Sequence, residues 1–270
     1  MKFLSKFYMF IIFALLYAPI IVLIVFSFNE AGSLNEFSGF STIWYEELFA
    51  DEAALTALKN SLILAILSSL IATTIATFAA LGIHHMRNKY IKGAISSVTN
   101  IPMMNPDIVT GVSMMLLFVA VAGIIGSKQF FGFGTMLIAH TTFCLPYALL
   151  SITPRFNQLD KSLSEAAQDL GCTPARAFFS VEFPEIIPGI FSALMMSFTL
   201  SLDDFVVSHF VSSPNFQTLP LYVYNQTVHN VKFSMYALCA LIVAVILVIL
   251  LIVNLTGNVS NKKKRTKGGI

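Results

Sequence analysis

Two adjacent acidic residues, Asp203 and Asp204, stand inside an apolar stretch that covers residues 188–211. A carboxylate in the hydrocarbon of a membrane costs roughly 2.5–3.5 kcal/mol on insertion scales, so it usually has a function or a compensating neighbour. Attraction of a cation is the chemistry that fits. Two interpretations remain open: a cation-attracting site on a path across the membrane, or a structural pair hydrogen-bonded to nearby Ser and Thr hydroxyls. Because successive helical residues point about 100° apart, one aspartate can face the path while the other pairs with a neighbouring helix.

A third acid, Asp107, follows Asn105-Pro106 at the start of another apolar stretch. This order suits an N-cap, a proline at the first helical position and an acid that is favourable to the helix dipole. An inner gate of the same path is an equally good interpretation of this carboxylate. His140 and His209 also lie in apolar stretches, and neither has a second His or an acid four residues away. We therefore expect polar contacts between helices there rather than a metal site.

A polar island, residues 155–187, separates two apolar stretches. Within it, Ser162 and Glu165 have the spacing of a capping box, which predicts that a helix begins there. Gly171 is expected to end this helix as a C′ glycine. One apolar face recurs at helical spacing between these points. Its members are Leu163, Ala166, Ala167 and Leu170.

A second short helix is predicted in the same island, with Thr173-Pro174 as its N-cap and first residue. Phe178 and Phe179 offer large apolar contacts on it. Pro184 and Pro188 are expected to stop this helix and to start the next apolar stretch. The island should therefore form a helix, a glycine bend and a second helix, and its small alanines would let it lie deep in the groove of a partner.

The rest of the chain is dominated by apolar segments, since 56% of its residues are hydrophobic and only 11% are charged. A soluble domain cannot bury so much apolar surface, so the sequence predicts an all-α membrane protein with six transmembrane helices. It is expected to form a single permease domain over residues 1–270, with residues 155–187 as a cytoplasmic loop. The expected spans are 8–28, 60–83, 106–126, 133–154, 188–211 and 235–256.

Basic residues set the orientation of such a chain. With both termini in the cytoplasm, thirteen basic residues lie inside and only Lys59, Lys128 and Lys232 lie outside. The island is then cytoplasmic, and the basic run at 262–267 is an anchor on anionic membrane lipid. The inside residues are Lys2, Lys6, Arg87, Lys89, Lys92, Arg155, Lys161, Arg176, Lys262, Lys263, Lys264, Arg265 and Lys267.

The largest outside loop, residues 29–59, carries six acids against one lysine. A plain solvated loop explains this charge, and so does a loop that attracts a cation or a basic partner surface. Trp44-Tyr45 lies in the same loop, where aromatic residues usually mark the lipid interface. A docking contact with an extracellular partner is the alternative for these two residues.

No phosphate-binding G-x-x-x-x-G-K-[ST] loop and no Gly-rich dinucleotide loop occurs in the sequence. The chain is therefore not expected to be an enzyme or to bind a cofactor itself. Energy for transport must come from a separate chain or from an ion gradient. We expect no contact with nucleic acid.

Residues 165–184 resemble the E-A-A-x3-G-x9-I-x-L-P signature of ABC-importer membrane subunits, with Val181 and Phe183 as conservative departures. In that family a separate ATPase, which binds ATP and Mg, grips this loop. The resemblance implies a type I ABC importer permease fold (MetI-like) and a multi-pass protein of the bacterial inner membrane. It also implies that the ATPase-coupling residues are Glu165, Ala166, Ala167, Gly171, Thr173, Phe178 and Pro184.

Further runs resemble the C-type permeases of spermidine/putrescine importers, and the likeness extends through nearly the whole chain. They are Asn105–Val109, Thr142–Pro146, Leu159–Ser162, Ser197–Ser208 and Thr218–Pro220. This resemblance implies a related B-type permease, a pair of cytoplasmic ATPase subunits and an extracytoplasmic polyamine-binding protein. Polyamines are polycations, which suits a path that carries Asp203, Asp204 and Asp107.

Three other functions compete with this one. A permease for another solute delivered by a binding protein shares the cytoplasmic island. A self-contained ion-coupled carrier or channel explains the membrane acids but leaves the island without a purpose. An intramembrane enzyme would need metal ligands or a nucleophile beside a base, and the sequence offers neither arrangement.

Overall fold

The computed structural model describes residues 2–32, 36–126, 130–229 and 232–247, and within these ranges the fold is helical, without a regular strand. The chain divides into two compact units: residues 56–222, and residues 1–55 together with 223–270. The expected basic anchor at 262–267 and the end of the expected sixth span lie outside the described residues. Each unit is considered by itself below.

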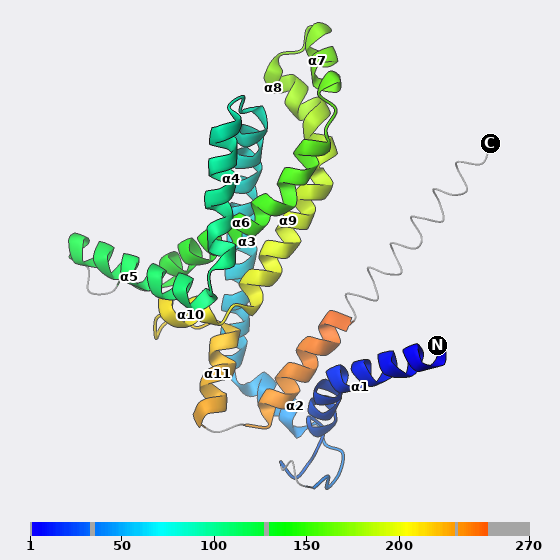
Figure 1. The fold of residues 1–270 in the computed structure, drawn as a ribbon. Coiled ribbons are helices and arrows are strands. Elements are labelled where there is room, and N and C mark those ends of the chain that lie inside the picture. Colours follow the sequence, from blue (N-terminus) through cyan, green and yellow to red (C-terminus); the bar gives the residue numbers. More distant parts are fainter. Residues whose placement is uncertain (1, 33–35, 127–129, 230–231, 248–270) are drawn as a thin grey trace. The chain divides into compact units, whose positions relative to one another are not determined.

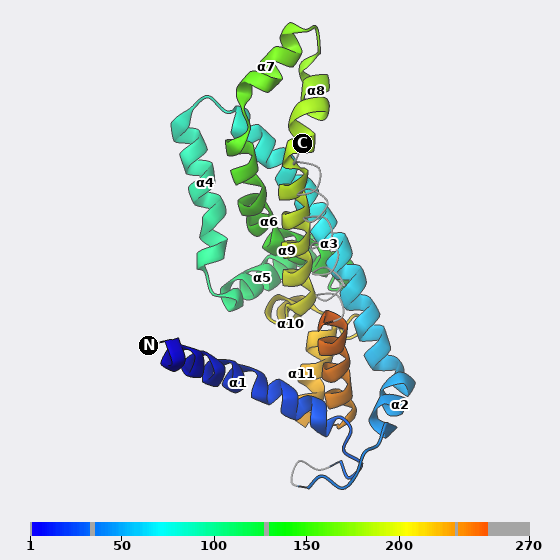
Figure 2. The same cartoon turned by 90° about the vertical axis from the view of Figure 1, so that its right-hand side faces the viewer.

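Three long helices make the core of the unit formed by residues 56–222, which are α3 (Glu52–His85), α6 (Phe133–Gln158) and α9 (Phe183–Asp203). Figures 1 and 2 show α6 and α9 side by side along much of their length. Small residues line the contact, as expected where membrane helices approach closely without a hydrophobic drive from water. The buried cluster is Ala76, Ala80, Ile83, Ala148, Leu149, Ile152, Phe156, Ile186 and Ala193.

Shorter helices complete this unit. Helix α4 (Lys89–Met104) runs beside α6, and α5 (Asp107–Ile125) packs on α10 (Val206–Val211). Gly111 allows that approach, because a Cβ built on it would lie 2.8 Å from Phe210 Cδ2. The amphipathic helix α4 was not expected from the sequence, which predicted only a connection between the second and third spans. The remaining helices of this unit are α7 (Lys161–Asp169), α8 (Pro174–Ala177) and the π-helical turn η1 (Phe178–Glu182), while α11 (Leu219–His229) begins here and ends in the other unit.

The other unit contains α1 (Lys2–Phe26), α2 (Ile43–Ala50) and an apolar helix at Ser234–Leu247. Its outer loop is held by the two aromatic residues noted in the sequence. Trp44 Nε1 donates to the Asn29 carbonyl at 2.7 Å, and the Tyr45 hydroxyl lies 2.8 Å from Ser27 Oγ. The Trp44 ring also packs against Phe233, with 5.4 Å between the ring centroids. Part of each aromatic side chain therefore shapes the loop itself.

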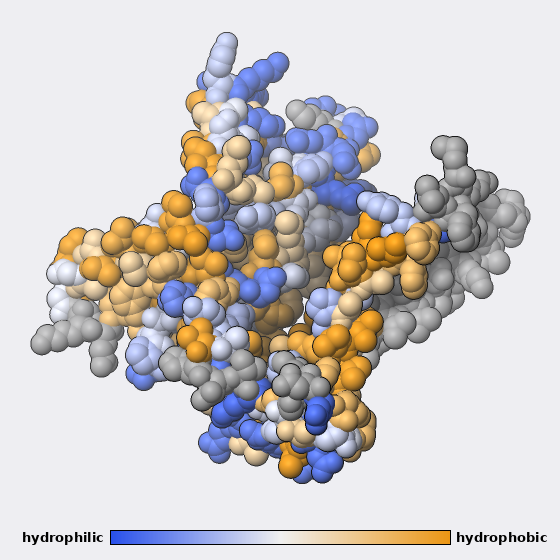
Figure 3. All heavy atoms as spheres, turned by 60° about the horizontal axis from the view of Figure 1, so that its bottom comes forward, coloured by the Kyte–Doolittle hydropathy of each residue, from blue (hydrophilic) through white to orange (hydrophobic). Residues whose placement is uncertain are grey.

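Five helices of the described chain are long and apolar enough to cross a membrane, and Ser234–Leu247 is a shorter apolar helix. These five helices and the shorter one each overlap one of the six expected spans, so the expectation of an all-α membrane protein is confirmed. Figure 3 shows broad hydrophobic areas on the surface of the molecule, which would be unusual for a soluble monomer. The five are Ser5–Phe26, Glu52–His85, Asp107–Ile125, Phe133–Gln158 and Pro174–Asp203.

The fifth span differs most from its expected limits of 188 and 211. It begins at Pro174 and ends at Asp203. The expectation that Pro184 and Pro188 end the preceding helix is wrong. The π turn η1 carries the chain through this point, since Phe183 N–H bonds to the Phe178 carbonyl five residues back. Pro184 has no N–H group to donate, and its place in the first turn of α9, directly after the π turn, requires no donor from it.

Candidate functional site

The polar island folds into two short helices, but its first cap is not the expected one. Asp160, rather than Ser162, is the N-cap of α7, and its carboxylate accepts from the Ser162 N–H at 3.0 Å. Ser162 lies inside the helix, so the predicted capping box with Glu165 does not form. An aspartate in the right position competes well with a serine, because its charged oxygen is the stronger acceptor. The same Ser162 hydrogen bonds hold the pKa of Asp160 below its usual range.

Gly171 ends α7 as expected. Its φ is +89°, a left-handed conformation that favours glycine. Cys172 N–H bonds to the Ala167 carbonyl at 3.1 Å and Gly171 N–H to the Gln168 carbonyl at 2.9 Å. These two bonds form a Schellman motif, which closes the helix and reverses the chain. The bend between the two island helices is thus fixed by backbone geometry.

The second island helix begins as predicted, with Thr173 as N-cap and Pro174 as first residue. Its aromatic residues divide between two roles. Phe178 packs against the core of α3, α6 and α9, whereas Phe179 is 62% exposed. Of the expected coupling residues, Phe178 therefore has its main contacts inside this chain. Phe179 is the one that offers an open apolar contact.

The apolar face predicted on α7 is uncovered in this chain. Leu163 is 51% exposed and Leu170 is 88% exposed, and Glu165 and Ala166 are exposed beside them. A nine-residue helix that leaves one leucine exposed within it and a second at its C-cap is short of the burial that normally stabilises a helix. The face therefore has the character of a contact surface for another protein.

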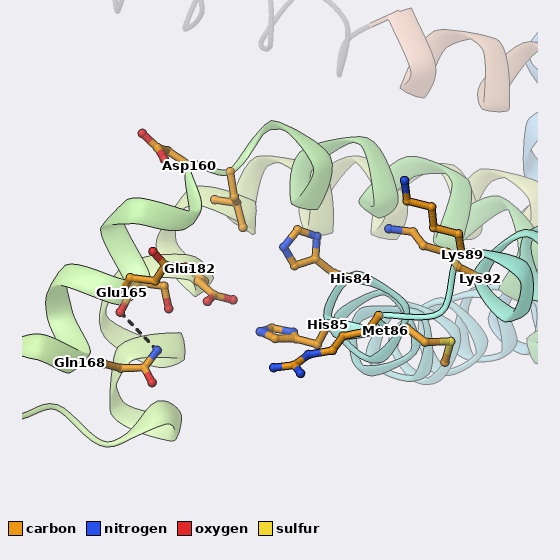
Figure 4. Close-up of a pocket in the computed structure, with 12 residues that line it drawn as sticks. His84, His85, Met86, Lys89, Lys92, Asp160, Glu165, Gln168 and Glu182 are labelled. Atoms are coloured by element: carbon orange, nitrogen blue, oxygen red, sulfur yellow. Dashed lines mark hydrogen bonds between the residues drawn. The ribbon is translucent and has the colours of Figure 1, made fainter.

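A cavity of about 680 Å³ lies beside this surface, between the island and the end of α3 with the start of α4. Figure 4 shows Glu165 and Glu182 on one wall of the cavity and His84 and His85 on the other, where the basic residues at the junction of α3 and α4 also lie. The basic side is formed by Arg87, Lys89 and Lys92, and the acidic side by Asp160, Glu165 and Glu182. Among the described residues, none of these six side chains forms a salt bridge across the cavity.

Glu182 is the residue of this cavity that the sequence did not single out. Only 8% of it is exposed, and its Oε2 atom is buried without a hydrogen-bond partner in the described chain. A buried carboxylate without a partner is expensive, so a cationic group normally meets it. In the sequence Glu182 occupies the unspecified position between Val181 and Phe183, where the family signature carries no information.

At its other end, α9 stops between the two aspartates that the sequence emphasised. Asp203 is the last residue of α9 and is exposed, whereas Asp204 is only 8% exposed. The Asp204 carboxylate accepts from the N–H groups of Val207 at 3.2 Å and Ser208 at 2.8 Å, so it caps α10. The two acids therefore take different environments, and a single helix over 188–211 does not form.

His140 lies fully buried next to this break, with 0% exposure. Its Nδ1 is 2.8 Å from Ser201 Oγ and its Nε2 is 3.1 Å from Ser208 Oγ. Asp204 Oδ2 is 3.6 Å from the same Nε2. The expectation that His140 makes polar contacts between helices is confirmed. Ser68 extends the cluster to α3, since its hydroxyl donates to Ser201 Oγ at 2.9 Å.

Asp107 begins α5 and is exposed. The expected cap at Asn105 does not form: Pro106 is the N-cap residue and makes no side-chain cap bond, while Asn105 ends α4. Asp107 lies one turn before Gly111, which contacts α10, so both are on the same face of α5. The structure thus brings Asp107 towards the segment that follows the break after Asp203.

The site residues fall into separate groups rather than one site. The expected coupling residues lie in the island and the first turn of α9. Of the expected pathway acids, Asp203 and Asp204 lie at the other end of α9, after roughly 30 Å of helix, and Asp107 lies at the start of α5. Trp44 and Tyr45 belong to the other compact unit. Among the described residues, no group of three or more His, Cys, Asp and Glu side chains could hold a metal ion.

Comparison with known protein families identifies the family of this chain. Residues 72–263 match the model of the binding-protein-dependent transport system inner membrane component. The chain belongs to this family. It is a membrane permease subunit of an ABC importer in the bacterial inner membrane, and ATP is hydrolysed on a separate subunit. A substrate-binding protein and an ATPase are its general partners.

Two curated relatives of the permease cover most of its length. The putrescine transport system permease protein PotI of Escherichia coli (strain K12) is 38% identical over 86% of this chain and 82% of its own. The spermidine/putrescine transport system permease protein PotC of Haemophilus influenzae (strain ATCC 51907 / DSM 11121 / KW20 / Rd) is 36% identical over 89% of this chain and 91% of its own.

Among solved structures, the permease resembles a chain of a bacterial alginate ABC transporter in complex with an alginate pentasaccharide-bound periplasmic protein. The TM-score is 0.75, the identity is 19%, and the match covers 94% of this chain and 92% of the other. At this identity the likeness shows the fold alone. The expected type I importer permease fold is thereby confirmed.

Proposed function

We propose that this permease moves polyamines, such as spermidine and putrescine, from an extracytoplasmic polyamine-binding protein into the cytoplasm. It would do so together with a related B-type permease and a pair of cytoplasmic ATPase subunits. The observation that carries the proposal is the exposed carboxylate of Asp203 at the end of α9, in a chain 36–38% identical to permeases named for these cations. A polycation needs acidic groups along its path, and an anion would need Lys or Arg there.

The pathway in this proposal includes Asp203 and Asp107 as the acids that meet the ammonium groups. Both are exposed in the single chain, so they are available to a path formed with the second permease. Asp204 has a different role, because its oxygens are occupied by the N–H groups of α10. It supports the path by fixing the end of α9.

The island is the proposed attachment point of the ATPase. Its uncovered leucines, with Glu165, Ala166 and Ala167, form a helix that can enter a groove of that partner. Gly171 and Thr173 hold the bend behind this helix, and Pro184 lies in the first turn of α9, which would carry its movement into the membrane. The remaining outer aromatics, Trp44 and Tyr45, are proposed to shape the loop that receives the binding protein.

The proposal is tested with the permease, its second permease, ATPase and binding protein reconstituted together in vesicles. Labelled spermidine and putrescine should enter only when ATP is present. Asp203→Asn should lower this uptake while the complex still assembles and the binding protein still stimulates ATP hydrolysis. Glu185→Gln is the matched control, since it removes an exposed carboxylate from the other end of α9 and should leave uptake unchanged.

Three outcomes would each overturn part of the proposal. Uptake of another solute, with none of either polyamine, would make the chain a permease for a different cargo. Uptake that continues when the ATPase is omitted would favour an ion-coupled carrier. Wild-type uptake by Asp203→Asn would remove this carboxylate from the path.

A further inference from the structure

One imidazole joins the helices on both sides of the break after Asp203. His140, on α6, meets Ser201 of α9 through Nδ1 at 2.8 Å and Ser208 of α10 through Nε2 at 3.1 Å. All three side chains are buried. Two segments that the chain separates by a non-helical step are therefore held at a fixed distance by a third helix.

The hydrogen bonds of this cluster are complete with a neutral imidazole, which has one donor and one acceptor. Ser68 donates to Ser201, so the Ser201 hydroxyl hydrogen is available to Nδ1. Ser68 Oγ is also 3.3 Å from the Ala65 carbonyl, and its shorter contact is the one to Ser201. This pattern assigns the ring proton to Nε2, where Ser208 Oγ and, at 3.6 Å, Asp204 Oδ2 lie. A side chain without these two nitrogens would remove one hydrogen bond from a buried hydroxyl on each of α9 and α10.

This cluster decides where the Asp203 carboxylate goes. Asp204 is held inward by the N–H groups of Val207 and Ser208, and Ser208 is held by His140. Since neighbouring residues at the end of a helix point in different directions, Asp203 is left on the exposed side. A loosened break would let the end of α9 turn and would move that carboxylate.

We propose that His140 is a positioning residue for substrate, which acts through Ser201, Ser208 and Asp204 to fix Asp203 in the path. This inference rests on the proposed polyamine function and names a determinant of its selectivity. Putrescine carries two ammonium groups and spermidine three, at different spacings. A carboxylate in one fixed position favours one spacing, and a mobile carboxylate accepts either.

The test uses the reconstituted four-component assembly and compares wild type with His140→Phe, which keeps an aromatic ring and removes both nitrogens. The number of polyamine molecules taken up per ATP hydrolysed should fall at least about tenfold, because the substrate charge is no longer met in place. The ratio of spermidine to putrescine uptake should also change. His140→Gln, which restores one donor and one acceptor, should recover part of both quantities.

A double variant separates positioning from a general packing defect. If His140 acts through Asp203, uptake by His140→Phe/Asp203→Asn should equal that of Asp203→Asn alone, since the two changes share one effect. Ser208→Ala provides a milder version in case His140→Phe does not assemble, and it should shift the spermidine-to-putrescine ratio in the same direction. Its matched control is Ser69→Ala, a buried serine whose hydroxyl bonds to the Ile66 carbonyl of its own helix.

Two results would overturn the inference. The first is that both His140→Phe and Ser208→Ala keep the wild-type uptake per ATP and the wild-type spermidine-to-putrescine ratio. The second is that the losses of uptake caused by His140→Phe and Asp203→Asn add up in the double variant. An assembly whose wild type moves no polyamine would instead overturn the proposed function. The two failures are distinguished by the wild-type measurement alone.

Discussion

At the start of α9, Glu182 faces a cavity whose opposite wall carries Arg87, and no salt bridge between described residues joins the two walls. At the end of the same helix, the polar atoms around Asp204 are paired with His140, serine hydroxyls and backbone N–H groups. Both regions contain charged side chains with little exposure to water. They differ in whether the chain itself supplies the partners.

This difference separates two uses of buried charge. A fully paired cluster stabilises one geometry, because each group removed leaves another unsatisfied. A charge without a partner lowers the stability of the isolated chain, so it is retained for a contact that the isolated chain lacks. The end of α9 is therefore built to stay in place. The start of α9 is built to receive an external group or to move.

The largest effect is expected at the paired end. Asp204→Ala removes the acceptor of two buried N–H groups and should lower the free energy of unfolding by about 3 kcal/mol. Thermal unfolding of the purified permease in detergent measures it. Asp203→Ala is the neighbouring control, because an exposed carboxylate should change stability by no more than about 0.5 kcal/mol. Equal losses in the two variants would contradict the division of roles between these acids.

A smaller loss of stability is expected from a change in the bend of the island at Gly171. Gly171→Ala places a Cβ at φ +89°, with no atom within 4 Å to collide with it, so only the backbone conformation is penalised. We expect a loss of about 1 kcal/mol and weaker ATPase association. Gly82→Ala is the matched control, since this glycine lies within α3 with nothing within 4 Å. If both variants behaved alike, the bend would not depend on glycine.

The opposite sign is expected at Glu182. Glu182→Gln removes a carboxylate whose Oε2 has no partner in the part of the chain that the structure describes, so the isolated permease should keep its stability or gain up to about 1 kcal/mol. We propose that a cationic group meets this carboxylate in the working complex, so the same change should also reduce ATP-driven uptake by removing that contact. The pair of measurements is the direct counterpart of the Asp204→Ala experiment. A marked loss of stability in Glu182→Gln would show that the two ends of α9 do not differ as described.

The smallest effect concerns pH at the island. The pKa of Asp160 is lowered by its bonds from Ser162, so the folded state favours the charged form. The cap therefore contributes its full stabilisation above the ordinary aspartate pKa of 3.8 and loses it as the pH falls through the lowered value. Hydrogen exchange of the Ser162 amide should lose protection over that acidic range. Asp160→Ala should show little protection of this amide at any pH.

Local sequence patterns were sufficient for much of this molecule. The spans are predictable because length and hydropathy decide whether a segment can cross a membrane. Gly171 and Thr173-Pro174 are predictable because turns and caps depend on residues within a few positions of each other. The π turn before Pro184 and the cap at Asp160 were missed, since in both places two local solutions compete and packing selects one.

The sequence by itself determined that the chain is a membrane permease with a polar island between two apolar segments and acids in its fifth apolar segment. Only the tertiary structure decided that Asp204 is the buried acid and Asp203 the open one, because the choice depends on His140, which is 61 residues from Ser201 along the chain. It also decided that Glu182 faces, across a cavity, the basic residues at the junction of α3 and α4. Contacts between distant segments carry no local pattern, so they appear only when the helices are packed together.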